Sequence, residues 1–243
     1  MMEWTEEALV LGARTHGETS AIAEVLTRDR GRWLGLVHGG RSRRTRPVLQ
    51  PGNVVEATWR ARLDGHLGRF TMEPVNMRAA TLMQSPLGIY GTQTLAAHLR
   101  LLPERDAHAR LYDMAEALLD NMADARTAGE LMIRFEVRLL DELGFGMDLA
   151  RCAATGASDD LLYVSPKTGR AVSRGGAEGY EDRLLPLPAF LLTGEVGAST
   201  REDLEQGFAL TGTFLARAVW HTREIEPPVE RDAFCRTVLK EAT

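Results

Sequence analysis

Hydrophobic positions in the first third of the chain fall in short runs that are separated by turn-forming residues. Residues 54–62 alternate, with Val55, Ala57 and Trp59 on one face and polar side chains on the other, which is the pattern of a half-buried strand. Five short strands in so short a span are typical of a small barrel such as the OB-fold, and a small open sheet is the alternative. The predicted strands are residues 8–14, 21–27, 32–38, 54–62 and 67–73.

The dipeptide Asp64-Gly65 between the last two predicted strands indicates a two-residue hairpin turn. Such a turn would place Trp59 opposite Phe70 and, on the other face of the ladder, Arg60 opposite Arg69. We expect the aromatic pair in the barrel core. The two arginines would repel each other in the free protein and be stabilised beside a phosphate backbone; alternatively, they extend into water or meet nearby acids.

From residue 85 onward the hydrophobic period is that of helices. Ser85 followed by Pro86 predicts a helix that ends near Leu102. Thr127 and Ser199, each followed three residues later by Glu, predict capping boxes for two longer helices. The helix after Thr127 is apolar nearly all round, so we expect it to be the buried centre of a helical body. Its narrow polar seam consists of Arg134, Arg138 and Asp141.

These periods predict an α+β chain with two domains. We place a five-stranded OB-fold barrel at residues 1–78 and a mainly α-helical domain at residues 79–243, within which residues 144–185 form a loop-rich insertion. No apolar run is long enough for a membrane span, so no membrane partner is expected. Two cysteines are too few for a disulfide framework, which indicates a cytoplasmic location.

The charge distribution separates the first domain from the rest of the chain. The net charge is −5, yet residues 1–78 carry 12 basic and 9 acidic side chains. A local basic cluster can bind a polyanion because salt screens more distant charges over about 10 Å. Seven arginines lie close together in the predicted barrel: Arg28, Arg30, Arg32, Arg41, Arg43, Arg44 and Arg46.

The segment from His38 to Pro47, between the third and fourth predicted strands, has the composition of a phosphate-binding loop. Its glycines give conformational freedom, and its four guanidinium groups, mixed with hydroxyls, suit bidentate phosphate contacts. A solvated connector is the alternative. On an OB-like barrel we favour nucleic-acid binding. Trp33 could stack on bases or belong to the core.

Motifs for catalysis are absent from the sequence. No glycine-rich phosphate loop, no His-Glu-x-x-His arrangement and no nucleophile elbow occurs. Paired acids such as Asp159-Asp160 are typical of a solvated surface. We therefore assign no catalytic residue and expect a protein that is not an enzyme.

Several segments resemble, in order, the RecO family of recombination mediators. The N-terminal matches are Ala8-Leu-Val-Leu-Gly12, Gly17-Glu-Thr-Ser-Ala21, Leu26-Thr-Arg-Asp-Arg-Gly31, Gly39-Gly-Arg-Ser-Arg-Arg44 and Leu49-Gln-Pro-Gly52. The segment Phe135-Glu-Val-Arg-Leu-Leu-Asp-Glu-Leu-Gly144 resembles the central helix of that family.

The resemblance implies an OB-fold followed by a helical domain, with a role in DNA repair and recombination at the nucleoid. It implies binding to single- and double-stranded DNA, annealing of complementary strands, and loading of the RecA recombinase onto strands coated by single-strand-binding protein. The implied partners are RecR and the acidic C-terminal tail of that coating protein. The implied DNA contacts are Arg41, Arg43, Arg44 and Arg46, supported by Arg28, Arg30 and Arg32; the ladder argument adds Arg60 and Arg69.

The insertion begins at Cys152, where many members of that family carry a zinc module of four cysteines. The other three ligand positions correspond here to Thr155, Ser173 and Gly176. Structural zinc requires four Cys or His ligands, so we expect neither zinc nor any other cofactor. We refer to these four residues as the module positions.

Two other functions are compatible with the sequence. An OB-fold RNA-binding accessory protein would use the same arginine loop, because phosphate contacts do not distinguish RNA from DNA. A protein–protein adaptor would instead act through the acidic helical domain.

Overall fold

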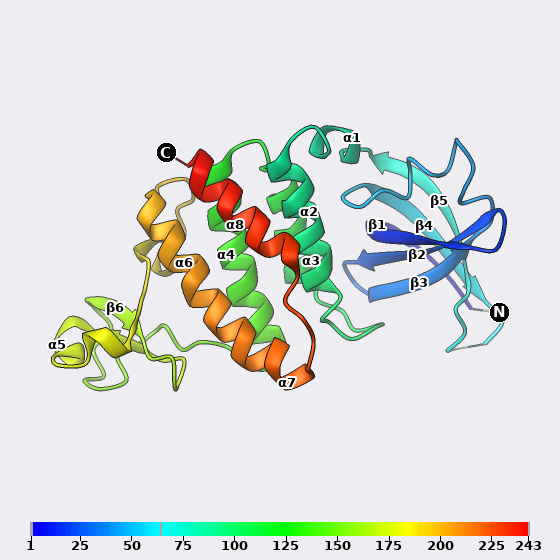
Figure 1. Cartoon of the computed structure of the whole chain (residues 1–243). Coiled ribbons are helices and arrows are strands. Elements are labelled where there is room, and N and C mark those ends of the chain that lie inside the picture. Colours follow the sequence, from blue (N-terminus) through cyan, green and yellow to red (C-terminus); the bar gives the residue numbers. More distant parts are fainter. Residues whose placement is uncertain (1, 64, 243) are drawn as a thin grey trace. The chain divides into compact units, whose positions relative to one another are not determined.

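The computed structural model describes residues 2–63 and 65–242, which divide into two compact units, Met1–Asp120 and Asn121–Thr243 (Figure 1). The first unit therefore contains the barrel together with three helices beyond residue 78, where we placed the domain boundary. Each unit is described separately. No helix within the described ranges is long and apolar enough to cross a membrane.

The five predicted strands form a closed barrel with the order β1-β2-β3-β5-β4, which confirms the OB-fold. β1 begins six residues earlier than predicted, and this length lets it pair with β4 through its first half and with β2 through its second. β3 and β5 close the barrel as parallel neighbours at Leu36 and Arg69. The strands are β1 (Met2–His16), β2 (Ser20–Thr27), β3 (Gly31–Val37), β4 (Val54–Ala61) and β5 (Arg69–Asn76).

The β4–β5 ladder has the predicted register, with Trp59 opposite Phe70 and Arg60 opposite Arg69. The strands end at Ala61 and begin again at Arg69, so they are shorter than a two-residue turn would give. The Asp64 half of the predicted turn lies outside the described residues. The register that was counted outward from the turn is therefore confirmed, although residues 62–68 lie outside the two strands.

Four aromatic rings fill the barrel core. Trp33 belongs to this cluster and is not an exposed stacking platform, since its indole lies 4.7 Å from that of Trp59 and 5.2 Å from that of Trp4. Edge-to-face pairs of this kind add about 0.5–1.5 kcal/mol each beyond the burial of their area. Phe70 completes the cluster, 5.8 Å from Trp4.

Three helices complete the first unit: α1 (Ala79–Leu82), α2 (Pro86–Leu99) and α3 (Ala109–Asp120). Ser85 caps α2 as predicted, because its hydroxyl accepts a hydrogen bond from the Gly88 amide at 3.0 Å. The connector between α2 and α3 packs on the barrel. Its Arg105 guanidinium lies 4.5 Å from the centre of the Trp33 ring.

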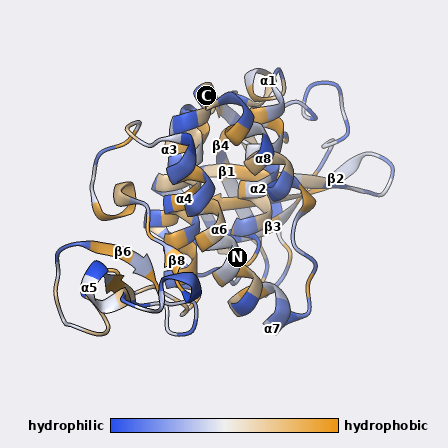
Figure 2. Cartoon of the chain, turned by 60° about the vertical axis from the view of Figure 1, so that its left-hand side comes forward, coloured by the Kyte–Doolittle hydropathy of each residue, from blue (hydrophilic) through white to orange (hydrophobic). Residues whose placement is uncertain are grey.

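The second unit is built on α4 (Ala125–Glu142), α6 (Arg201–Leu215) and α8 (Val229–Glu241). α6 carries hydrophobic residues, orange in Figure 2, and continues through a π-helix, η3 (Ala216–Trp220), into α7 (His221–Arg223). α6 and α8 both pack on α4, which is the centre of the helical unit as predicted, although Leu131 and Val137 are only partly buried.

Neither predicted capping box is present. α4 is capped by Asp124, which accepts from the Thr127 amide, and α6 is capped by the box of Thr200 and Asp203. The carboxylate of Glu130, expected at the first of these caps, is instead buried and accepts hydrogen bonds from the amides of Gly197 and Ser199. Several Ser, Thr and Asp residues near each helix start can serve as caps, and tertiary contacts decided between them.

The insertion contains more regular structure than a loop. β6 (Leu161–Val164) lies between β7 (Ala171–Ser173) and β8 (Leu185–Pro186) in a three-stranded sheet. Short helices flank it: α5 (Arg174–Ala177), η1 (Glu181–Arg183) and η2 (Ala189–Leu192).

Candidate nucleic-acid interface

A groove of about 730 Å³ opens on the barrel where β3 meets β5. Its described lining residues include no Asp or Glu, whereas three arginines and two histidines contribute to it. A nucleic-acid backbone is a chain of negative charges, so a groove of this composition is suited to it. The basic lining residues are His38, Arg60, Arg62, His66 and Arg69.

The β3–β4 loop borders this groove through Thr45. The loop has its own order, because the Ser42 hydroxyl accepts from the Thr45 amide at 3.1 Å and the Ser42 carbonyl accepts from the Arg46 amide at 3.0 Å. Asn53 holds its far end by donating to the carbonyls of Pro47 and Val48. The loop is therefore a fixed projection of the barrel.

Three arginines of this loop are exposed: Arg43, Arg44 and Arg46. Within the described ranges, their guanidinium groups have no hydrogen bond or ion pair. These side chains are exposed, so a phosphate could bind them without breaking a contact among the described residues. We call these three residues the loop arginines.

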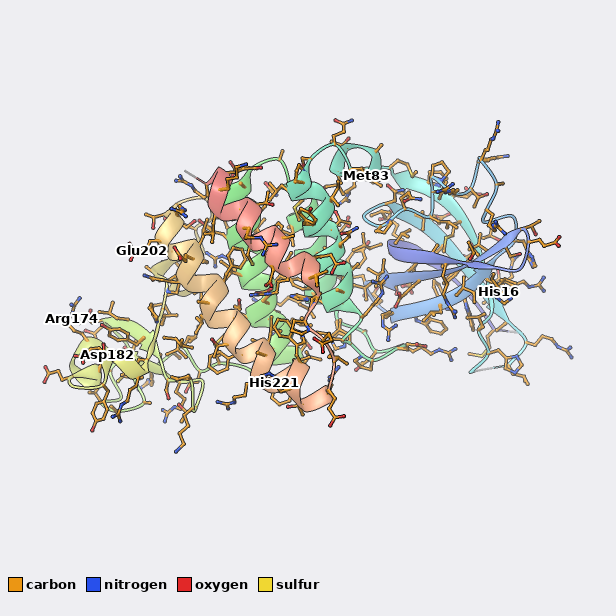
Figure 3. All side chains as sticks on the ribbon, in the orientation of Figure 1. His16, Met83, Arg174, Asp182, Glu202 and His221 are labelled. Atoms are coloured by element: carbon orange, nitrogen blue, oxygen red, sulfur yellow. The ribbon has the colours of Figure 1, made fainter. Side chains whose placement is uncertain are left out.

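Arg41 has a different role from the loop arginines. Its Nη1 donates to the carbonyls of Gly17 at 3.1 Å and Glu18 at 2.8 Å. It thereby holds the β1–β2 turn, whose first strand ends at His16 (Figure 3). Arg41 is exposed, but one of its guanidinium nitrogens is used to stabilise this turn.

The three arginines at the β2–β3 turn are engaged with acidic side chains. Arg28 makes a bidentate pair with Asp113 at 2.9 and 3.0 Å, and this hydrogen bonding lowers the pKa of the Asp113 carboxyl. Arg30 pairs with Glu6. Arg32 pairs with Glu24 at 2.7 Å and also donates to the Leu102 carbonyl, with only 14% of its side chain exposed. A phosphate that binds Arg28, Arg30 or Arg32 must therefore compete with an acidic side chain, which is not the case for the loop arginines.

Arg60 and Arg69 lie side by side on the outer face of the barrel, but they differ in pairing. Arg60 donates to Glu3 at 2.8 Å, and this hydrogen bond lowers the pKa of the Glu3 carboxyl. Arg69 is exposed and has no side-chain partner among the described residues. Glu3 therefore offsets the repulsion that we expected between the two arginines, because β1 brings this acid next to Arg60.

Sequence reasoning missed three groove residues, His38, Arg62 and His66. Arg62 and His66 flank the predicted turn, so the basic residues at its two sides were a usable signal. His38 is brought to the same place only by the parallel pairing of β3 with β5. That pairing joins strands distant in sequence, and no local pattern indicates it.

The four module positions lie close together in space, as the resemblance to a four-cysteine module implies. The sulfur of Cys152 accepts hydrogen bonds from the amide and hydroxyl of Ser173, both at 3.2 Å, and from the Thr155 amide at 3.4 Å. Burial acts to raise the pKa of the Cys152 thiol, but these hydrogen bonds lower it to about 6. A Cβ at Gly176 would lie 2.8 Å from this sulfur, so the site is filled without a fourth side chain.

This donor set does not fit structural zinc. Hydroxyls and a glycine cannot replace three thiolates. Across the described residues, no group of three or more His, Cys, Asp or Glu is arranged to hold a metal ion. The Cys152 sulfur is instead held by hydrogen bonds from Thr155 and Ser173.

Comparison with known proteins agrees with this architecture. Two sequence models match: the N-terminal part of recombination protein O at residues 1–78, and its C-terminal part at residues 90–223. Proteins named DNA repair protein RecO from Rhizobium rhizogenes and Mesorhizobium japonicum are each 55% identical over 239 residues, which is 98% of this chain and 92% and 94% of theirs. The one from Brucella abortus is 52% identical over 237 residues, 98% of this chain and 96% of its own.

Proposed function

The chain belongs to the recombination protein O family, and we propose that it is a non-enzymatic mediator of DNA repair and recombination that binds single-stranded DNA through its barrel. In this proposal the protein anneals complementary strands and helps to load the RecA recombinase onto strands coated by single-strand-binding protein. RecR, the acidic tail of the coating protein, and single- and double-stranded DNA are the proposed partners.

The observation that carries the proposal is the set of loop arginines beside a basic groove. Their guanidinium groups are exposed, have no hydrogen-bond or ion-pair partner among the described residues, and are presented by an ordered loop on an OB-fold. Since phosphates are identical along a strand, contacts of this kind bind without sequence preference. Neutralising two approaching strands would also lower their mutual repulsion, which favours annealing.

The test replaces the loop arginines together by alanine and measures binding to a single-stranded oligonucleotide over a series of salt concentrations. Each lost phosphate contact lowers the slope of log affinity against log salt by about 0.7 on single strands, so three contacts predict a decrease of about 2. The same variant should anneal complementary strands more slowly. The parent should anneal them without ATP.

The matched control is the triple alanine variant of Arg151, Arg183 and Arg236. These arginines are exposed on the second unit, so the variant loses the same net charge from a different surface. A salt slope that changes equally in both variants, or in neither, would contradict the assignment of the loop. Competition by RNA as strong as that by DNA would favour the RNA-binding alternative.

A further inference from the structure

The β4–β5 hairpin loop, residues 62–68, carries two exposed leucines beside the basic groove. Leu63 is 63% exposed and Leu67 is 41% exposed. Each directly follows a groove residue, Arg62 or His66. Single exposed leucines are ordinary on protein surfaces, but two on one short loop next to a cationic groove form a mixed apolar and basic surface.

The return side of this loop is held in place by the barrel core. The Trp59 indole donates to the Leu67 carbonyl at 3.0 Å, and the Leu36 amide donates to the Gly68 carbonyl at 3.0 Å. Gly68 has φ +67°, and a Cβ there would lie 2.3 Å from the Trp59 ring, so only glycine fits.

The connector between α2 and α3 also contacts this loop. Arg105 donates to the His66 carbonyl at 3.1 Å. Its guanidinium also covers the ring of Trp33. The backbone on both sides of Leu67 is thus anchored, and its exposure follows from the position in which the loop is built.

We propose that Leu63 and Leu67 contact the faces of unstacked bases when the phosphates of the same strand lie in the groove. This inference rests on the proposed function and deepens it, because it names the structural state of the DNA that the site selects. Each nucleotide of a strand has an anionic phosphate and an apolar base face. The loop places a basic residue next to a leucine twice, at Arg62-Leu63 and at His66-Leu67. In intact duplex the base faces are already stacked, and apolar side chains reach them only by opening a base step.

Charge favours DNA over a protein as the occupant of this surface. Basic groups extend from the hairpin loop along the groove to the β3–β4 loop, with no acidic residue among the described lining residues. A long polyanion contacts that whole extent. A short acidic peptide would contact only one part of this basic surface. The test below therefore includes binding of such a peptide as an alternative outcome.

The experiment compares the parent with the double variant Leu63→Ser/Leu67→Ser on four probes. Three are DNA of equal length, namely a single strand, an abasic single strand and a blunt duplex, and the fourth is a short acidic peptide. Met83→Ser is the control, since Met83 is 53% exposed and lies directly after α1 (Figure 3). Thermal melting shows that each variant is folded. A single strand with 2-aminopurine reports base unstacking through its fluorescence.

We expect the double variant to bind the single strand about tenfold more weakly, from lost apolar contact, with an unchanged salt slope because no charge is removed. Its affinity for the abasic strand and for the duplex should match that of the parent. The 2-aminopurine signal on binding should be smaller. The control should behave like the parent on every probe.

Unchanged affinity for the single strand, or an equal loss on the abasic strand, would overturn the base-contact proposal. Loss of binding to an acidic peptide without loss on DNA would assign the leucines to a protein partner and overturn it as well. These outcomes are distinct from failure of the proposed function, which would appear as a parent that does not bind single strands or as loop-arginine variants with an unchanged salt slope.

Discussion

Replacing Arg231 by methionine should strongly destabilise the helical unit, because it leaves a carboxylate buried without its counter-ion. Arg231 on α8 donates to both oxygens of Glu136 on α4, at 2.7 and 2.9 Å. Glu136 is fully buried, and Arg231 is 6% exposed. Thr211 on α6 also donates to Glu136 at 2.5 Å, so one network joins the three central helices.

The expected magnitude follows from the burial of the pair. Burial acts to lower the pKa of the Arg231 guanidinium, but Glu136 raises it above its ordinary value, so the group stays charged. Removing one partner of a buried pair typically costs about 3–5 kcal/mol. Arg231→Met should cost that much unfolding free energy. The double variant Glu136→Leu/Arg231→Met, which removes both charges, should lie within about 2 kcal/mol of the parent.

The assay is urea unfolding of the whole chain, combined with hydrogen exchange of the α4, α6 and α8 amides. Hydrogen exchange assigns the loss to the helical unit, which matters because the chain has two compact units. Arg138→Met is the control. Arg138 pairs with Asp141 and Glu142 on the partly exposed surface of α4, with 31% of its side chain exposed, and should cost less than about 1 kcal/mol.

Two results would refute this reasoning. A cost below about 1 kcal/mol for Arg231→Met would show that the carboxylate finds water or a proton readily. The single variant Glu136→Leu completes the comparison. If the double variant loses as much unfolding free energy as Arg231→Met and Glu136→Leu lose in sum, the two residues act independently.

Two further predictions concern the metal and the outer face of the barrel. Purified protein should contain no structural zinc, because three of the four module positions lack metal ligands; elemental analysis showing roughly one zinc per chain after chelator treatment would disprove this. Arg69→Gln should weaken binding to single strands while leaving the melting temperature equal or slightly higher, since Arg69 has no side-chain partner among the described residues. Arg60→Gln should also weaken binding but without a gain in melting temperature, because it loses the pair with Glu3. If both variants bind DNA like the parent, this face is not part of the site.

Local patterns predicted the strands of the barrel and the register of β4 with β5. Alternation along residues 54–62 and the spacing across the following turn predicted the register of Arg60 with Arg69 and of Trp59 with Phe70. Strand periodicity and the pairing of consecutive strands act between neighbours in sequence, so short-range order is enough to define them. The same holds for Ser85 as the cap of α2.

Only the tertiary structure decided which arginines are free. Nine were candidates from sequence, and their partners come from distant segments: Asp113 for Arg28, Glu24 for Arg32 and Glu3 for Arg60. The loop arginines have no such partner within residues 2–63 and 65–242, because their loop projects from the barrel. Charge counts along the chain cannot separate the paired arginines from the loop arginines, because ion pairing depends on distance in space.

The helical unit shows the same limit more sharply. Local pattern placed Glu130 in a capping box and gave no role to Glu136, yet both carboxylates are fully buried. Their hydrogen-bond donors lie 67–95 residues away, namely the amides of Gly197 and Ser199 for Glu130 and the guanidinium of Arg231 for Glu136. A buried carboxylate is stable only where donors from other elements meet it, so the fold decides which glutamates are buried, whereas the local period alone could predict the helix.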